Sequence, residues 1–135
     1  MDKLVFIIDD DPIYLKTMQN HFRLLGGFQT ESYTNGDEAL ANLSKDPFLI
    51  ILDHHLQDPA KNGIYYLNEI RKKKQKTPIL YMTSDNNPAL LEKVNAAGGN
   101  KLIIKDSAFL VYLRTALDEI LQKTEKRSFF KRLFS

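Results

Sequence analysis

The sequence predicts an α/β fold in which five parallel strands alternate with five helices in a doubly wound sheet. Apolar runs of strand length recur five times along the 135 residues, and a stretch with helical periodicity follows each of them. Most of these runs are continuously apolar, as expected for parallel strands buried on both faces. Short, right-handed connections leave few topologies for such a chain, and the flavodoxin-like strand order 2-1-3-4-5 is the natural one.

The first strand and helix are predicted over residues 3–25. Residues 3–8 form an apolar run, after which Asp11 is a favourable N-cap and Pro12 a favourable first helical residue. Apolar residues spaced by three and four then mark one face of a helix, and they are Leu15, Met18, Phe22 and Leu25. A Gly-Gly pair at residues 26–27 ends this helix.

The next elements are shorter. Residues 28–33 form a half-polar strand, which is typical of a sheet edge. An Asn-Gly pair turns the chain into a short helix around residues 38–43, and an Asp-Pro pair precedes the third strand, residues 48–52. The segment 56–63 contains Pro, Asn and Gly and is predicted to be a loop.

The second half of the chain continues the alternation. The helix after this loop finishes in the basic run 71–74, whose charges complement the helix dipole. Residues 79–82 form the fourth strand, and a helix follows between the Asn-Pro pair at 87–88 and the Gly-Gly pair at 98–99. Residues 102–104 form the fifth strand. Five apolar positions stripe the last helix, namely Leu110, Leu113, Leu117, Ile120 and Leu121.

The composition is that of one soluble globular domain, with 43% hydrophobic and 27% charged residues. The absence of Cys excludes a disulfide framework and a thiolate metal site, and it fits the reducing cytoplasm in which we expect the protein to work. The first apolar run ends in three Asp residues, which excludes a signal peptide, and no run is long enough to span a membrane.

Charge divides the chain into a domain over residues 1–122 and a basic, aromatic tail over residues 123–135. The tail has five basic residues and one acidic residue, so the remainder is net acidic although the whole chain is +2. An acidic body is a poor match to a nucleic-acid-binding domain, so direct nucleic acid binding is not expected. For the tail we expect an unstructured end, and the alternative is a helix whose apolar face contacts a partner or a membrane surface.

Polar residues follow four of the five predicted strands. They are Asp9, Asp10 and Asp11 after the first strand, Asp53 after the third, Thr83 and Ser84 after the fourth, and Lys105 after the fifth. Ligands bind outside the carboxyl ends of parallel strands, so these side chains are expected to converge on one crevice. Clustered carboxylates repel one another unless a cation lies between them, and Mg²⁺ is a hard ion that prefers such oxygens.

The same residues suit a phosphoryl group. Asp53 stands alone at its strand end and is the candidate nucleophile, because a carboxylate can form an aspartyl phosphate. The Lys105 ammonium can add a positive charge near the phosphoryl oxygens, and the Thr83 hydroxyl can hydrogen-bond them. A purely structural role as a helix cap would need one Asp, and this chain has three in a row.

These strand ends resemble those of the receiver domain of two-component response regulators, and the resemblance covers residues 1–122. The matching segments, in the family's order and approximate spacing, are Phe6 to Pro12, Ile51 to Asp53, Met82 to Ser84 and Ile103 to Lys105. The roles that the resemblance implies are phosphoacceptor for Asp53, Mg²⁺ ligands for Asp9, Asp10, Asp53 and the backbone carbonyl of His55, and phosphate-binding and switch residues for Thr83, Ser84 and Lys105.

The function implied by this resemblance is that of a single-domain response regulator in a phosphorelay. The phosphoryl donor would be a phosphohistidine on a sensor histidine kinase or a histidine phosphotransfer protein. The domain would catalyse its own phosphorylation through Asp53 and Lys105 and would slowly lose the phosphoryl group again, without being an enzyme in the usual sense. No effector domain follows the last helix, so output is expected through contacts with a downstream protein.

The chain departs from the family's pattern around the site. Gly63 comes two residues late, which indicates an insertion in the loop after the third strand. Lys105 is followed by Asp106 where the family has Pro, and a cis peptide is costly without Pro. Leu102 replaces an aromatic residue that ordinarily moves with Thr83. We therefore expect intact phosphorylation chemistry and an unusual readout.

Two rival functions fit the strand ends less well. In a haloacid-dehalogenase-type phosphatase, the acidic triplet 9–11 would supply the nucleophile, Thr83 the second motif and Lys105 the third. However, Pro12-Ile13 stands where that family has Gly-Thr, and Asp53 has no role in it. A receiver-like interaction module that is not phosphorylated would not need the complete set of carboxylates, threonine and lysine.

Overall fold

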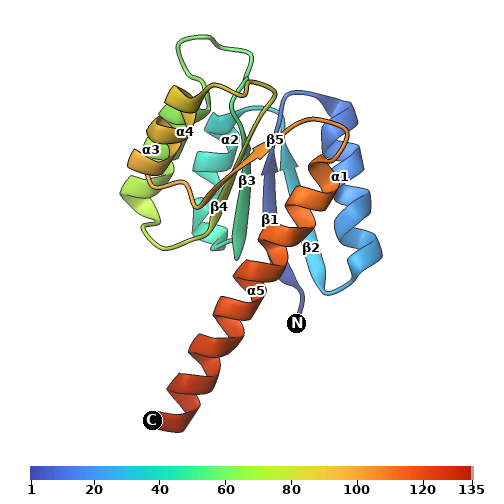
Figure 1. Ribbon diagram of the computed structural model, residues 1–135, viewed down its shortest axis with the longest axis vertical. Coiled ribbons are helices and arrows are strands. Elements are labelled where there is room, and N and C mark those ends of the chain that lie inside the picture. Colours follow the sequence, from blue (N-terminus) through green and yellow to red (C-terminus); the bar gives the residue numbers. More distant parts are fainter. Residues whose placement is uncertain (135) are drawn as a thin grey trace.

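The computed structural model describes residues 1–134 and confirms the predicted α/β fold (Figure 1). Five parallel strands form one sheet in the order β2-β1-β3-β4-β5. The strands are β1 (Lys3–Ile8), β2 (Phe28–Tyr33), β3 (Leu49–Asp53), β4 (Ile79–Thr83) and β5 (Lys101–Ile104). The α-helices are α1 (Pro12–Leu25), α2 (Gly36–Ala41), α3 (Gly63–Lys73), α4 (Pro88–Ala96) and α5 (Phe109–Phe134).

Helices cover both faces of the sheet. Helices α1 and α5 lie on one face, and α2, α3 and α4 lie on the other (Figure 1). Successive strand residues point to opposite faces, so Val5 and Ile7 of β1 pack under α1 and α5, whereas Phe6 and Ile8 pack under the other three helices. The central strands β1 and β3 are buried on both sides, which explains why they read as continuous apolar runs.

Helix α2 begins earlier than the sequence pattern indicates. The prediction placed this helix around residues 38–43, whereas it covers Gly36–Ala41 and is followed by a 3₁₀ turn, Leu43–Lys45. The cause is the side chain of Asn35, which accepts a hydrogen bond from the Glu38 amide at 2.9 Å and so acts as the N-cap.

Helix α5 differs most from the prediction. Residues 123–134 were expected to form an unstructured end, but they continue α5 as one helix, so the predicted boundary at residue 122 falls inside it. Seven of these twelve residues are the good helix formers Lys, Glu, Arg and Leu, and no Gly or Pro interrupts the stretch. Figure 1 shows this half of α5 projecting beyond the sheet. Within residues 1–134, none of the helices combines the length and apolar character needed to cross a membrane.

The register of the sheet brings the predicted site residues to one edge. Ile8 pairs with Leu52, so Asp9 and Asp53 follow neighbouring strand positions. Thr83 pairs with Ile104 at the ends of β4 and β5. Because all five strands are parallel, these carboxyl ends meet at the same edge of the sheet.

Candidate functional site

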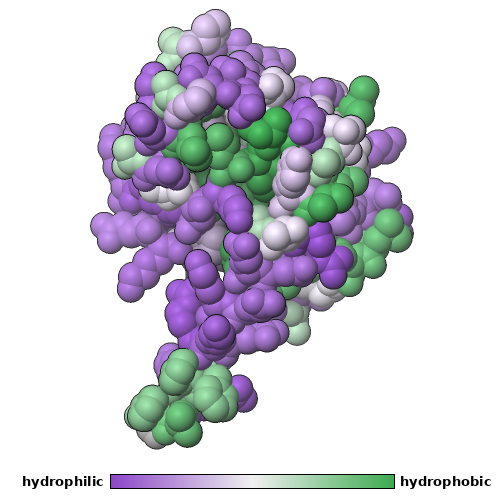
Figure 2. All heavy atoms as spheres, in the orientation of Figure 1, coloured by the Kyte–Doolittle hydropathy of each residue, from purple (hydrophilic) through white to green (hydrophobic). Residues whose placement is uncertain are grey.

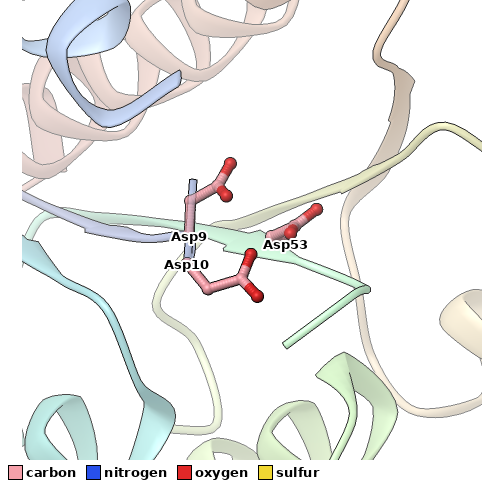
Figure 3. A group of neighbouring side chains, drawn as sticks. All are labelled: Asp9, Asp10 and Asp53. Atoms are coloured by element: carbon pink, nitrogen blue, oxygen red, sulfur yellow. The ribbon is translucent and has the colours of Figure 1, made fainter. Parts of the chain in front are cut away.

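Three carboxylates converge where β1 and β3 end. Asp9, Asp10 and Asp53 each offer an oxygen, and these oxygens lie within 4.8 Å of one another (Figure 3). Asp9 is 0% and Asp53 2% exposed, while Asp10 is half-buried. Burial of two carboxylates this close together is costly unless a positive charge compensates them.

Lys105 supplies part of that compensation. Its Nζ atom donates a hydrogen bond to Asp9 Oδ2 at 2.7 Å and lies 3.0 Å from Asp53 Oδ1. Burial by itself lowers the pKa of Lys105, but the hydrogen bond to Asp9 and the charges of both carboxylates outweigh burial and raise it. The ammonium also lies 4.1 Å from the centre of the Tyr14 ring, in cation–π geometry. Lys105 therefore stays charged inside the site.

The carboxylates themselves are shifted toward their neutral forms. Burial, followed by the nearby charge of Asp9, raises the pKa of Asp53 to about 7. Burial also raises the pKa of Asp9, although Lys105 and the Asp11 amide act in the opposite direction. One ammonium therefore does not balance the buried negative charge in this cluster.

The site has a feature that fits a divalent cation. Asp53 Oδ1 is buried, and the contact that the structure gives it is the ion pair with the Lys105 ammonium at 3.0 Å. A buried carboxylate oxygen with a single ammonium contact, beside two further carboxylates, matches the oxygen ligands that Mg²⁺ prefers. Asp9, Asp10 and Asp53 thus fit Mg²⁺ on their own chemistry. His55 is exposed in the loop after β3, and a role for its carbonyl remains a prediction.

Asp11, the third residue of the acidic triplet, has a different role. Its Oδ1 accepts a hydrogen bond from the Ile13 amide at 2.9 Å, which makes Asp11 the N-cap of α1, as predicted. Its own amide donates to Asp9 Oδ1 at 2.9 Å. The capping explanation thus holds for Asp11, and Asp9 and Asp10 remain available to the site.

Thr83 and Ser84 lie at the end of β4. Thr83 is fully buried, and its hydroxyl oxygen accepts a hydrogen bond from the Asp85 amide at 3.0 Å. Ser84 is exposed. Leu102, which pairs with Tyr81 in the sheet, is half-buried and packs on the side of α2, α3 and α4. None of the peptide bonds within residues 1–134 is cis, so Lys105 and Asp106 are joined in trans.

Sequence reasoning noticed Gly63 but missed its packing role, and it missed Tyr14 and Tyr81 altogether. A Cβ atom on Gly63 would lie 2.3 Å from the Tyr81 hydroxyl and 2.6 Å from the carbonyl oxygen of Asp53, so only glycine fits here. The sequence did carry a signal for this packing, namely the late position of the glycine. Helix α3 starts at Gly63, whose amide donates a hydrogen bond to the His54 carbonyl at 2.9 Å. The contact of Tyr14 with Lys105 had no such signal.

Comparisons with known proteins place this chain in a family. The family model described as response regulator receiver domain matches residues 5–124. Over 84 residues the chain is 37% identical to the transcriptional regulatory protein CpxR homolog of Haemophilus influenzae, and over 80 residues 29% identical to the response regulator SaeR of Staphylococcus aureus. These matches cover 62% and 59% of this chain but 35% and 34% of those proteins, so the chain spans about a third of the curated relatives it matches.

A solved structure shows the same fold. The two-component response regulator from Clostridium difficile superimposes with a TM-score of 0.82 at 24% identity, over 91% of this chain and 98% of that one. The family match covers most of the chain, and the strand order and acidic cluster are consistent with it. This chain therefore belongs to the response regulator receiver domain family, whose members are signalling domains of two-component systems.

Proposed function

We propose that the chain accepts a phosphoryl group on Asp53 from a phosphohistidine of a sensor histidine kinase or a histidine phosphotransfer protein. The observation that carries this proposal is the state of Asp53: it is buried beside Asp9 and Asp10, and the Lys105 ammonium lies 3.0 Å from its Oδ1 atom. A buried carboxylate with a raised pKa, held beside a positive charge at the edge of a sheet, is arranged to act on a ligand.

Each neighbouring residue has a role in this transfer. A carboxylate oxygen of Asp53 attacks phosphorus, the P–N bond breaks, and its electron pair returns to the imidazole of the donor. The Lys105 ammonium leaves its contact with Asp53 and binds a phosphoryl oxygen. Asp9, Asp10, Asp53 and the His55 carbonyl would hold Mg²⁺, which, when bound, neutralises the carboxylates and attracts phosphoryl oxygens. Attack by water on the same phosphorus breaks its bond to the Asp53 oxygen, releases inorganic phosphate and slowly restores the carboxylate.

The readout starts from Thr83. Its hydroxyl now accepts from the Asp85 amide at 3.0 Å and would turn to donate to a phosphoryl oxygen, drawing the loop after β4 toward the site. Leu102 has no ring to swing inward, so the change would pass through residues 84–87 into α4. Output would then reach a downstream protein that contacts α4, β5 and α5.

The decisive experiment compares Asp53→Asn with the unaltered chain. After incubation with acetyl phosphate and Mg²⁺, intact-protein mass spectrometry should show one added phosphoryl group on the unaltered chain and none on Asp53→Asn. Asp58→Asn is the matched control, because it removes an exposed carboxylate from the same loop. Equal phosphorylation of the Asp53 variant would refute the acceptor assignment. An unmodified parent chain would favour a receiver that acts only as an interaction module.

A further inference from the structure

The last two turns of α5 expose four large apolar side chains in one place. Phe129, Phe130, Leu133 and Phe134 are 55%, 54%, 60% and 79% exposed. Figure 2 shows them as an apolar cap at the projecting end of α5, beyond a hydrophilic stretch of the same helix. None of them belongs to the two hydrophobic cores. A contiguous exposed cluster of this kind marks an interaction site.

The four residues form one continuous face. Their spacing of one and four places them on the same side of the helix. The rings of Phe130 and Phe134 are stacked with centroids 6.3 Å apart, and Phe129 meets Phe130 edge to face at 5.9 Å. We call this surface, made by Phe129, Phe130, Leu133 and Phe134, the α5 apolar face.

Positive charge borders the α5 apolar face on both sides. By helical geometry, Arg127 and Lys131 flank it on one side and Arg132 on the other. Within residues 1–134, no carboxylate forms an ion pair with Lys126, Arg127 or Lys131. These side chains are therefore available to a negatively charged partner.

The body of the domain extends the same positive surface. A groove of about 330 Å³ separates α5 from the base of the sheet, and Lys76, Arg127 and Lys131 line it. A second groove, of about 210 Å³, lies against α5 and is lined by Lys3 and Arg132 together with Glu125. Basic residues thus lie both where α5 leaves the domain and along its projecting end.

We propose that the α5 apolar face binds the surface of an anionic lipid bilayer. Aromatic and aliphatic side chains on one helix face, with Lys and Arg along its borders, match a helix lying at the boundary between headgroups and acyl chains. The projecting position lets the end of α5 reach a flat surface before the rest of the domain does (Figure 1). Anionic headgroups complement Arg127 and Lys131.

A second copy of the chain is a poorer occupant. Pairing two α5 apolar faces would bring the flanking cations Arg127 and Lys131 of two copies together, and Glu125 is the single acidic residue within residues 123–134. A bilayer of anionic lipids carries the opposite charge and needs no shaped pocket. Binding there would concentrate the receiver domain at a membrane surface, whatever the state of Asp53.

Vesicle co-sedimentation of the full chain tests the proposal. The chain should pellet with vesicles of equal parts phosphatidylcholine and phosphatidylglycerol and not with phosphatidylcholine alone, and added salt should weaken the binding. A Phe130→Ser, Phe134→Ser double variant should lose at least roughly tenfold in affinity, and Arg127→Glu, Lys131→Glu should lose a similar amount. Two control variants should bind as the parent does: Leu24→Ser, at a residue of α1 that is 71% exposed, and Lys73→Glu, at an exposed residue of α3.

Each alternative outcome is informative. Failure of the parent to bind anionic vesicles, or undiminished binding by the double Phe variant, overturns the proposal. Sedimentation velocity that shows a dimer dependent on Phe130 and Phe134, without vesicle binding, would instead assign the face to a second copy. The acetyl phosphate reaction at Asp53 should proceed normally in these variants, which shows that they are folded and separates this test from that of the phosphoacceptor.

Discussion

The position of the Lys105 ammonium is set by side chains from the ends of β1 and β3 and from α1. Asp9 and Asp53 contact it at 2.7 and 3.0 Å, and the Tyr14 ring covers it at 4.1 Å. The ring is itself held by Phe109, which meets it edge to face at 5.1 Å. Tyr14 therefore limits where Lys105 can point when Asp53 changes its charge or its substituent.

We predict that Tyr14→Leu slows phosphorylation by acetyl phosphate, whereas Tyr14→Phe does not. Leucine removes the ring that holds the ammonium, and a cation–π contact of about 0.5 to 1.5 kcal/mol corresponds to a rate loss of roughly twofold to tenfold. Phenylalanine keeps the ring. The rate is measured by mass spectrometry over time at fixed Mg²⁺. Equal rates for the Leu and Phe variants would show that the ring has no part in positioning Lys105.

The sequence predicted which polar residues meet at the strand ends, but it did not predict which side chains contact them. Asp9, Asp10, Asp53 and Lys105 could be grouped in advance, because parallel strands bring their carboxyl ends together whatever lies between them. The contact of Tyr14 with Lys105 depends on how α1 packs across the sheet, and no spacing rule encodes that placement.

Among the elements, the start of α3 is the part most tightly fitted to the site. Gly63 begins this helix directly over the end of β3, and its Cα approaches both the Asp53 carbonyl and the Tyr81 hydroxyl. The Tyr81 hydroxyl in turn contacts His54 Nδ1 at 2.5 Å. The loop inserted between β3 and α3 thus leads into a closely packed junction, although the loop itself is largely exposed.

Gly63→Ala should lower the free energy of unfolding by about 1 to 3 kcal/mol, because the new methyl group cannot fit without moving α3 or β3. Urea denaturation followed by circular dichroism measures this loss. Tyr81→Phe removes the nearer of the two obstructing oxygens, so the double variant should lose less than the sum of the single losses. Additive losses would mean that the alanine methyl group does not contact Tyr81.

The predicted ends of helices and strands agree with the structure where the sequence contains a capping residue or a helix breaker. The strands and helix α1 were predicted closely, since apolar runs and a capping Asp with Pro define their ends. The conformation of residues 123–134 was misjudged, because an unstructured end was expected from their place at the end of the chain and not from a helix stop signal. Without Gly or Pro after residue 122, nothing in the sequence ends α5 there.

For the molecule as a whole, the acidic site opposes folding at neutral pH when no cation is bound. Unfolding returns Asp53 to an ordinary pKa near 3.8, whereas burial raises it to about 7 in the folded chain. Between these two values the folded state holds more protons than the unfolded state, so the free energy of unfolding falls as pH rises through this window. The full difference is on the order of 4 kcal/mol, reached above pH 7.

The Asp53→Asn variant should therefore be more stable than the parent in EDTA, by an amount that grows from pH 4 to pH 7 and then levels off. The neutral amide avoids both the burial of a charge and the repulsion from Asp9, while Lys105 keeps its 2.7 Å hydrogen bond to Asp9. Urea denaturation of both proteins across this range, with Asp58→Asn as the control, measures the difference. Added Mg²⁺ should narrow this stability difference above pH 7, because the ion binds more tightly to the chain that retains the Asp53 carboxylate and so stabilises it more. A difference independent of pH would mean that Asp53 titrates normally in the folded protein, and the carboxylate cluster would then not be the strained, cation-requiring site inferred from its burial.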